Sequence, residues 1–229
     1  MPERTIQQAA TAKKGGFLQR KTWRDGSFRP RVDAIATLVT DKSVLDLGCA
    51  SARNRPDWVH GQIAALATST VGVDLDRAAV EELVDRGFDV RFGDAETFRI
   101  DEQFDVVFAG EIIEHLDCFK GLFETARAHL KEGGVLVLTT PNAFAFSNFV
   151  YRIAGEVKVN GDHTCWFCET TLQQLIERQD FSCVQMRYLH FTSPGRLRGP
   201  IAGAVRRVLP ERLAWSTLIA VAQPNMTQP

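Results

Sequence analysis

The stretch VLDLGCA at residues 44–50 decides the fold. It completes a short apolar run, SVLDL at residues 43–47, whose length suits a buried parallel strand and which Gly48 stops. Asp46 lies near the end of that strand, and a glycine lets the backbone approach a ligand closely. We therefore expect a buried strand followed by a tight turn at a binding site.

Strands and helices alternate outward from this stretch. We expect strands at residues 43–47, 70–74, 89–92, 104–109 and 135–140, and helices at 31–39, 56–67, 77–86 and 118–130, the last closing at Gly133-Gly134. A helix at 170–179 and strands at 182–190 and 215–222 follow. The alternation predicts an α/β, Rossmann-like, doubly wound domain with a seven-stranded, mostly parallel sheet covered by helices on both faces. Right-handed crossovers then gather the loops after the strands at one edge, where ligands bind.

Carboxylates follow the next two strands. Asp74 ends GVDLD at residues 72–76 and is placed to accept hydrogen bonds from a ribose diol. Asp94 lies in FGDAE at residues 92–96, placed to accept from an adenine amino group, while Ala95 offers a backbone N–H. The fourth strand ends in Gly110-Glu111 beside the centre of the site.

Together these residues resemble the class I S-adenosylmethionine-dependent methyltransferases over residues 30–190. The resemblance implies S-adenosylmethionine as cofactor, with the turn at Asp46, Gly48, Cys49 and Ala50 holding its methionine part, Asp74 and Leu75 its ribose, Asp94 and Ala95 its adenine, and Gly110 and Glu111 the border with the substrate. One departure is plain: Ala50 and Ala52 stand where the family commonly has glycine. The rival nicotinamide fingerprint G-x-G-x-x-G is missing from GCASAR at residues 48–53.

Two histidines are candidate bases. Glu111, Glu114 and His115 share a face if EIIEH at residues 111–115 forms a helical turn, and His163 follows the fifth strand. Methyl transfer to a hydroxyl needs alignment and a base, and a neutral imidazole has a suitable pKa. We hypothesise that His115 or His163 is the base and that Glu111 positions it or the cofactor.

The same residues offer an alternative. Glu111, Glu114, His115 and His163 form a plausible ligand set for a divalent ion, and their spacing partly resembles the RNA 3′-terminal 2′-O-methyltransferases. DHTCWFCETTLQQL at residues 162–175 resembles methyltransferases of sugar and natural-product pathways more closely. We therefore expect O-methylation of a sugar or other small metabolite without a metal. Metal-dependent RNA methylation and a non-catalytic nucleoside-binding module are the alternatives.

The charge of the chain limits which classes of binding partner can be expected. The net charge of −1 gives no general case for nucleic acid, although residues 1–31 carry eight Lys or Arg against two acids. We expect a basic, partly disordered or acceptor-covering arm at residues 1–30 and a methyltransferase domain at 31–229. Within it, the aromatic-rich residues 141–168 are a possible lid, and residues 194–212, with five Arg and one acid, are a basic insert that makes a lipid-linked acceptor conceivable.

The number of cysteines indicates in which cellular compartment the protein works. Five Cys, an odd number, and no apparent signal peptide predict reduced thiols in the cytoplasm. No apolar run approaches the roughly 20 residues that span a bilayer. We interpret Cys165-x-x-Cys168 as packed thiols around buried Trp166 and Phe167 rather than a zinc or redox site. The oligomeric state is left open.

Overall fold

The computed structural model describes residues 30–189 and 208–225. The described helices are α2 (Pro30–Val39), α3 (Val59–Ala64), α4 (Arg77–Asp85), α5 (Phe119–His129), α6 (Phe146–Ile153), α7 (Glu169–Arg178) and α9 (Glu211–Ala214), with a 3₁₀ turn at Ile113–His115. The strands are β1 (Ser43–Leu47), β2 (Ser69–Asp74), β3 (Val90–Phe92), β4 (Phe104–Gly110), β5 (Leu130–Pro141), β6 (Phe181–Leu189) and β7 (Thr217–Pro224).

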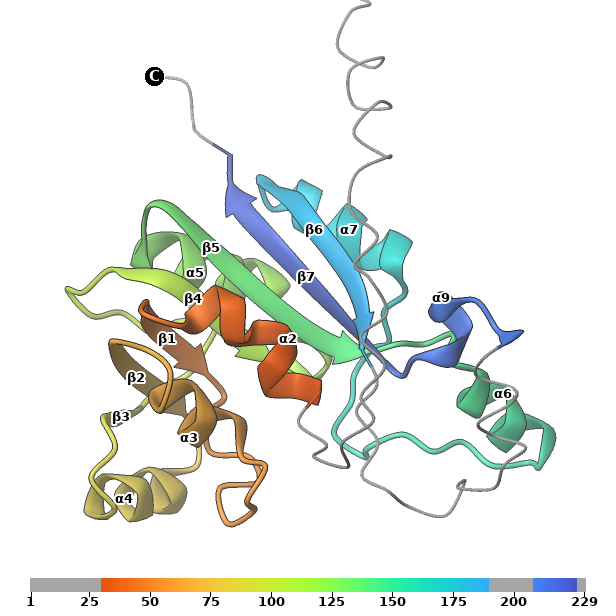
Figure 1. The fold of residues 1–229 in the computed structure, drawn as a ribbon, viewed down its shortest axis with the longest axis horizontal. Coiled ribbons are helices and arrows are strands. Elements are labelled where there is room, and N and C mark those ends of the chain that lie inside the picture. The colour runs from red at the N-terminus through yellow and green to blue at the C-terminus, as the bar shows by residue number, and fades with distance from the viewer. Residues whose placement is uncertain (1–29, 190–207, 226–229) are drawn as a thin grey trace, which may run out of the picture.

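All seven strands form one sheet in the order β3-β2-β1-β4-β5-β7-β6 (Figure 1). β1 through β5 pair in parallel, and β7 is antiparallel to both β5 and β6. The predicted doubly wound, mostly parallel sheet is confirmed. Because β7 runs against its neighbours, the chain returns to the carboxyl-end edge of the sheet before its last strand begins.

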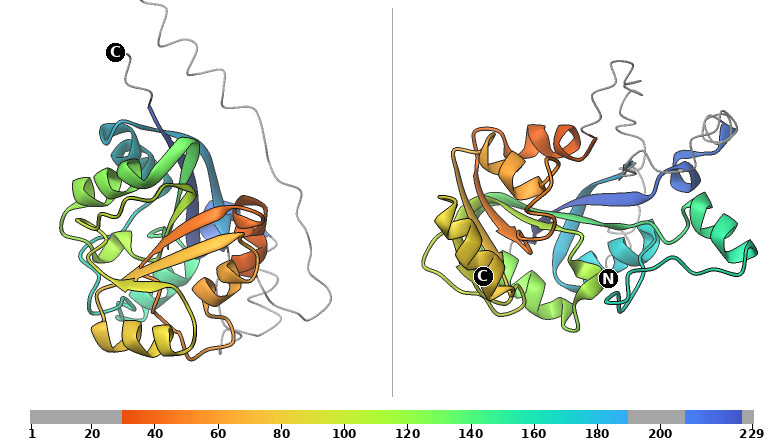
Figure 2. Two further views of the ribbon diagram at one scale, coloured as in Figure 1. Left: turned by 90° about the vertical axis from the view of Figure 1, so that its left-hand side faces the viewer. Right: turned by 90° about the horizontal axis from the view of Figure 1, so that it is seen from below.

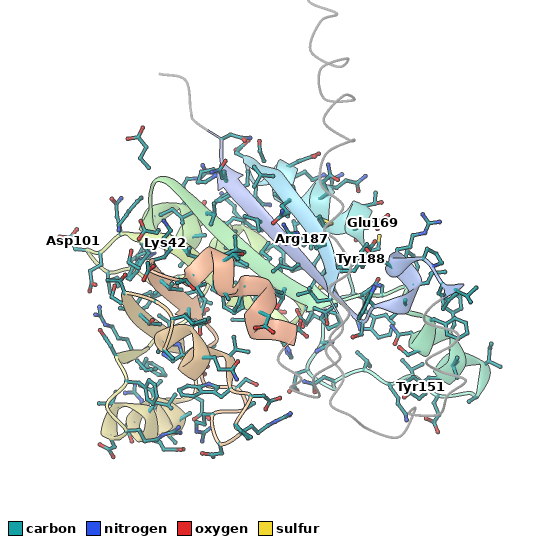
Figure 3. The ribbon with its side chains drawn as sticks, viewed as in Figure 1. Lys42, Asp101, Tyr151, Glu169, Arg187 and Tyr188 are labelled. Atoms are coloured by element: carbon teal, nitrogen blue, oxygen red, sulfur yellow. The ribbon has the colours of Figure 1, made fainter. Side chains whose placement is uncertain are left out.

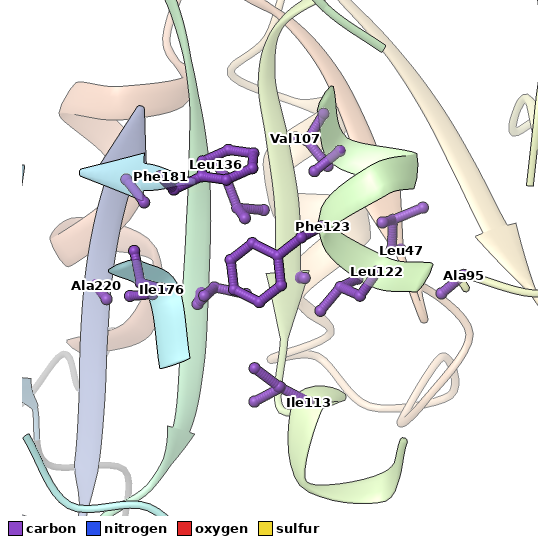
Figure 4. Close-up of a cluster of buried hydrophobic side chains, with 14 of the residues drawn as sticks. Leu47, Ala95, Val107, Ile113, Leu122, Phe123, Leu136, Ile176, Phe181 and Ala220 are labelled. Atoms are coloured by element: carbon purple, nitrogen blue, oxygen red, sulfur yellow. The ribbon is translucent and has the colours of Figure 1, made fainter. Parts of the chain in front are cut away.

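Helices cover both faces of the sheet (Figure 2). The larger core packs α5 and α7 on one face through side chains such as Phe123, Phe181 and Ile176 (Figure 4). On the opposite face, Ile35 of α2 and Ile63 of α3 pack on strands β1, β4, β5 and β7. Alternation along β1 explains the division, because Leu45 and Leu47 belong to the first core and Val44 to the second.

Two predicted boundaries are wrong. The helix expected at residues 56–67 covers only Val59–Ala64, because the chain before it stays in turns and the buried Trp58 indole donates a hydrogen bond to the Cys49 carbonyl, 2.7 Å away. The helix expected at residues 118–130 is confirmed as α5, but the start of the strand expected at residues 135–140 is wrong, because β5 already begins at Leu130, which pairs with Phe104, and runs through Gly133-Gly134. A register irregularity after Phe104 accommodates the extra strand residues.

The carboxyl-end edge carries an excursion between β5 and α7. It contains α6, which lies beside α9 away from the helical layers (Figures 1 and 2). A helix in this excursion was not among the elements expected from the sequence. None of its residues is buried, so α6 does not pack on the sheet. The predicted arm at residues 1–30 lies outside the described residues except for Pro30, as does the basic insert except for residues 208–212.

Candidate functional site

The turn after β1 is shaped by Gly48. Its φ of +79° lies in the left-handed region, and a Cβ there would sit 2.8 Å from Ile112 Cδ1. The Gly48 and Cys49 N–H groups both donate to the Val73 carbonyl, at 2.8 and 3.2 Å. Ala52 also adopts a left-handed φ, of +61°. One of the two glycine replacements noted in the sequence therefore stands where glycine is the favoured residue.

Asp74 ties the first turn to the second strand. Its Oδ2 accepts from the Ala50 N–H at 2.8 Å, and its Oδ1 accepts from the Asp76 N–H at 3.0 Å. The side chain is half-buried, and each ionised oxygen can accept a further bond. The next residue, Leu75, leaves 62% of its surface exposed, which is an unusual position for a large apolar side chain beside a carboxylate.

Asp94 organises the loop after β3. Its Oδ1 accepts from the Glu96 N–H at 2.9 Å, and its carbonyl accepts from the N–H groups of Thr97 and Phe98. Gly93 donates to the Asp74 carbonyl at 3.0 Å, which holds this loop against the end of β2. Ala95 is buried in the core. The structure therefore brings the Asp74 and Asp94 loops together at one edge, as the sequence predicted for them.

Asp46 lies within β1, two residues before Gly48. It is 3% exposed, and His60 Nδ1 of α3 lies 2.8 Å from its Oδ2. Burial raises the pKa of Asp46, and the hydrogen bond to His60 acts in the opposite direction. The sequence analysis missed His60, because only the placement of α3 over β1 brings the two residues together. The predicted contact of Asp46 with the cofactor stays a prediction.

Cys49 is packed rather than reactive. It is 4% exposed, and burial, with the nearby Asp46 and Asp74 carboxylates, raises the pKa of its thiol. A Cβ on Gly72 would meet its Sγ at 2.6 Å, so glycine at this position of β2 makes room for it. Its backbone is also engaged, by the Val73 carbonyl and the Trp58 indole, and its predicted contact with the cofactor stays a prediction.

The segment after β4 departs from expectation. The helical turn predicted across residues 111–115 is wrong, because Glu111 takes a left-handed φ of +54° and only Ile113–His115 form a 3₁₀ turn. The Glu111 N–H donates to the carbonyl and the hydroxyl of Thr139, at 2.9 and 3.1 Å. Glu114 is buried, and its Oε2 accepts from the Thr140 hydroxyl at 2.9 Å.

His115 and His163 meet at this edge. Their ring centroids are 4.5 Å apart and their planes are nearly perpendicular. The Thr164 N–H donates to the Glu114 carbonyl at 2.8 Å, which fixes the His163 segment beside the 3₁₀ turn. Burial, then the neighbouring His115, lowers the pKa of His163 below its ordinary value. The arrangement keeps a neutral imidazole at the end of the sheet.

Glu114 completes a cluster with the two histidines. One possible ligand atom from each of Glu114, His115 and His163 lies within 4.8 Å of the others. Glu111, which the sequence grouped with them, is not a member of this cluster in the described part of the chain. The structure therefore brings together three of the four residues of the alternative metal set.

A cavity of about 190 Å³ lies where β5, α6, α7 and α9 converge. Asn142, Phe149, Tyr188 and Arg212 are among its lining residues. The Asn142 side chain donates to the carbonyls of Arg212 and Trp215, at 2.9 and 2.8 Å, so it ties β5 to α9. Figure 3 places Tyr188 and Glu169, another lining residue, together on this side.

The Cys165-x-x-Cys168 segment agrees with its interpretation only in part. Both thiols are free, and Cys165 packs against the larger core. Phe167 is buried, but the prediction that Trp166 is buried is wrong, because it is 38% exposed. Burial raises the pKa of Cys168, but hydrogen bonds involving Thr171 outweigh it, so the pKa is lowered overall.

Comparison with known proteins gives the family. A methyltransferase domain model matches residues 20–186. A probable S-adenosylmethionine-dependent methyltransferase of Mycolicibacterium smegmatis is 31% identical over 151 residues, which cover 64% of this chain and 54% of the relative. The chain thus spans about half the length of this curated relative.

Solved structures share the fold. A possible histamine N-methyltransferase of Thermotoga maritima has a TM-score of 0.60 and 20% identity, covering 85% of this chain and 88% of its own. A complex of DhpI with SAH has a TM-score of 0.53 and 18% identity, covering 89% and 90%. With most of its length matched by the family model, the chain belongs to the methyltransferase domain family of S-adenosylmethionine-dependent enzymes.

Proposed function

We propose that this protein transfers a methyl group from S-adenosylmethionine to a hydroxyl oxygen of a small acceptor, a sugar or a related metabolite. One observation carries the proposal: the Gly48 turn, the Asp74 loop and the Asp94 loop are hydrogen-bonded to one another at a single sheet edge. The His115–His163 pair lies at the end of the neighbouring strand β4 on that edge. Binding groups and a base therefore meet where ligands bind in open α/β sheets.

The residues present fit the cofactor. The left-handed turn at Gly48, against which the Ile112 side chain packs, borders the place proposed for the methionine part, and the Asp74 carboxylate suits a ribose diol. Leu75 offers an exposed apolar surface beside it, which suits an adenine face, and Asp94 suits the adenine amino group. The two arginines in the loop after β1 are paired with carboxylates of the chain, Arg53 with Glu82 and Arg55 with Asp57, which favours a nucleoside without phosphates. When bound, the cofactor supplies an electrophilic methyl group.

The acceptor side follows from the histidines. A lone pair of the acceptor oxygen forms the new C–O bond, and the electrons of the breaking C–S bond return to sulfur, giving S-adenosylhomocysteine. The hydroxyl proton passes to a neutral imidazole, for which the lowered pKa of His163 is suited. Methyl transfer otherwise depends on alignment. The cavity at Phe149 and Tyr188 offers an apolar wall for the rest of the acceptor.

Release of S-adenosylhomocysteine tests the proposal. The purified chain is incubated with S-adenosylmethionine and a panel of free sugars, nucleotide sugars and phenolic metabolites. We expect turnover with a hydroxyl acceptor, and a loss of about a hundredfold or more in kcat for the variant that removes the base, His115→Ala or His163→Ala. If both variants keep near-normal turnover with an accepted substrate, the base hypothesis is lost.

A second candidate is metal-assisted methylation of an RNA 3′ end. The observation that favours it is the Glu114–His115–His163 cluster, whose carboxylate and imidazole atoms suit a divalent ion such as zinc or manganese. Metal retained after purification, and activity on RNA 3′ ends that a chelator abolishes and the ion restores, supports it. Activity on a small acceptor that is unchanged by chelator favours the first proposal.

We also propose that the protein works in the cytoplasm with reduced thiols. All five cysteines lie in the described residues and are free. Among the described residues, no helix has the length and hydropathy needed to cross a membrane. Thiol titration of the protein in freshly lysed cells tests this, because an oxidising compartment would leave fewer than five reactive thiols under denaturing conditions.

A further inference from the structure

A histidine and an aspartate are buried together two residues before the Gly48 turn. His60 of α3 is 1% exposed and Asp46 of β1 is 3% exposed, and His60 Nδ1 lies 2.8 Å from Asp46 Oδ2. Alternation along β1 turns Asp46 to the same side as Val44, which is the side that α3 covers. The pair therefore joins α3 to the strand that ends at the turn, and both of its members can ionise.

The neighbouring strand is shaped to admit the imidazole. Gly72 of β2 pairs with Asp46, and a Cβ at this position would lie 2.8 Å from His60 Cε1. The rings of Trp58 and Phe88 lie beside the imidazole, with centroids 5.2 and 6.0 Å away. The missing side chain of Gly72 thus leaves the space that His60 occupies, and the aromatic rings help to bury it.

The other titratable and charged groups near the pair come from β2, from the turn and from the end of α4. Asp74 is close enough for its charge to raise the pKa of Asp46. Cys49 is close to both carboxylates, and its raised pKa keeps the thiol neutral. The Arg86 guanidinium lies over the Trp58 ring, 5.2 Å from the centroid. Among the described residues, the ionisable hydrogen-bond partner of Asp46 is therefore His60.

One proton decides the net charge of this pair. When a neutral His60 donates through Nδ1–H to the ionised Asp46 carboxylate, the pair carries one negative charge. Uptake of a proton by either partner makes the pair neutral, because the two groups titrate as a unit. Burial opposes an uncompensated charge, and it raises the pKa of Asp46. We therefore expect the charge of the pair to change with pH.

This charge distinguishes the proposed cofactor from its product. Both S-adenosylmethionine and S-adenosylhomocysteine carry an ammonium and a carboxylate group on the methionine part, but only the first carries a sulfonium. Two unit charges about 10 Å apart, at the effective dielectric constant of a protein site, change an affinity by about tenfold. A negative pair next to the turn would favour the sulfonium by this amount, and a neutral pair would not.

We propose that His60 is a positioning residue that, through Asp46, holds one negative charge beside the Gly48 turn and so favours the sulfonium cofactor over the neutral product. The inference rests on the proposed binding of S-adenosylmethionine at this edge. A second effect follows by linkage, because a ligand that prefers the deprotonated pair must release the proton when it binds. S-adenosylmethionine should release it, and S-adenosylhomocysteine should not.

Isothermal titration calorimetry of the full chain with each ligand tests the proposal. The pH is varied from 5 to 7, where the amino and carboxyl groups of both ligands largely keep their charges. Two buffers with different ionisation enthalpies give the number of protons released on binding. His60→Asn keeps a side-chain N–H donor near the position of Nδ1 but cannot take up a proton, whereas His60→Leu removes the donor.

His129→Gln is the matched control. His129 is also buried, but its ring nitrogens lie 2.8 Å from the Thr125 carbonyl and 3.0 Å from the Ile100 backbone nitrogen, so its hydrogen bonds involve no carboxylate. This variant should keep the pH dependence of the wild-type chain. Thermal melts of all variants show whether each one is folded, and His60→Asn decides the test if His60→Leu does not fold.

We expect the preference of the wild-type chain for S-adenosylmethionine over S-adenosylhomocysteine to rise about tenfold from pH 5 to pH 7. His60→Asn should keep the high preference throughout, because Asp46 stays ionised beside a neutral donor. His60→Leu should show the low preference throughout, because a buried carboxylate without a donor takes up a proton.

Two results overturn the proposal: a wild-type preference that does not change with pH, and a pH dependence that His60→Asn retains. An equal loss of affinity for both ligands in the two His60 variants shows a purely structural role and also overturns it. A wild-type chain that binds neither ligand is a different outcome, because it removes the proposed function itself.

Discussion

The two sides of the carboxyl-end edge of the sheet differ in how many of their side chains find partners within the domain. Around the ends of β1, β2 and β3, the Asp74 and Asp94 carboxylates accept backbone N–H groups from neighbouring turns. Around the end of β5, the excursion through α6 leaves Phe149 and Ile153 exposed. In the first region, backbone hydrogen bonds set the geometry of the carboxylate loops. In the second region, apolar side chains remain in contact with solvent.

Of the substitutions considered, replacing Asp74 should have the largest effect, and it should act on the affinity for S-adenosylhomocysteine. Asp74→Asn removes the charge that two backbone donors and a ribose diol share, so we expect S-adenosylhomocysteine to bind about a hundredfold more weakly, since hydrogen bonds to a charged group contribute about 1.5–3 kcal/mol each. Isothermal titration calorimetry measures the change. Asp76→Asn is the control, because this exposed residue caps α4 and an asparagine caps equally well, so affinity should stay unchanged. Wild-type affinity in Asp74→Asn would remove the nucleoside site from this edge.

Two glycines with similar φ separate backbone strain from crowding. Gly48→Ala places a Cβ 2.8 Å from Ile112, whereas Gly87→Ala, at φ +89°, meets nothing within 4 Å. We expect a loss of about 2 kcal/mol in unfolding free energy for Gly48→Ala and about 1 kcal/mol for Gly87→Ala, because only the first adds a contact to the strain. Urea denaturation gives both values. Equal losses would show that Ile112 yields freely and that the turn is less constrained than its contacts indicate.

Acid should weaken the contact between β1 and β4 at the amino-end edge of the sheet, opposite the Asp74 and Asp94 loops. Hydrogen bonds from the backbone and side chain of Ser43 lower the pKa of Asp105 from 3.8 to about 2. Because the folded-state pKa is below the unfolded value, the stabilisation is present above the unfolded pKa and is lost as the pH falls toward 2. Asp105 is 35% exposed on its side chain, so we expect only about 1 kcal/mol after solvent screening. Denaturant melts across this range should show a flatter dependence in Asp105→Asn; an identical dependence would contradict the assignment.

The smallest expected effect concerns the alanine that replaces a family glycine. Ala52→Gly relieves a left-handed φ of +61° but adds freedom to the unfolded chain, so the net gain should be about 0.5 kcal/mol. The same denaturation series measures it. S-adenosylhomocysteine affinity should rise or stay level, since a smaller residue admits the ligand more easily. A loss of stability would indicate that the Ala52 methyl group packs usefully in the turn.

Sequence reasoning succeeded where local pattern and topology agree. The runs before Gly48 and Asp74 are short, apolar and sharply ended, so the parallel sheet and the meeting of Asp74 with the Asp94 loop could be predicted. It failed where tertiary contacts decide. Nothing near Asp46 in the sequence signals His60, and no periodicity reveals the left-handed φ that takes Glu111 away from Glu114 and His115.

The excursion failed for another reason. The apolar residues of α6 do recur every three or four positions, as in a helix. Such a pattern normally predicts that the apolar side is buried. Here Asn148 anchors the polar side to Asn142 and Ala143 and reverses that rule. The spacing is typical of a helix but does not tell which side of it faces the domain. That side depends on the Asn142 and Ala143 carbonyls, whose position is set by the folded chain. Trp166 was misplaced into the core by the same assumption.

The reversed direction of β7 has a consequence for how such a protein diversifies. Because β6 ends and β7 begins at the carboxyl-end edge, the connection between Leu189 and Thr217 has both of its ends at that edge. Insertions or losses in this connection can remodel substrate choice while leaving the strand pairing of β6 with β7 intact. A change of length in this connection therefore alters the surface beside the candidate site without disturbing the order of strands that builds the sheet.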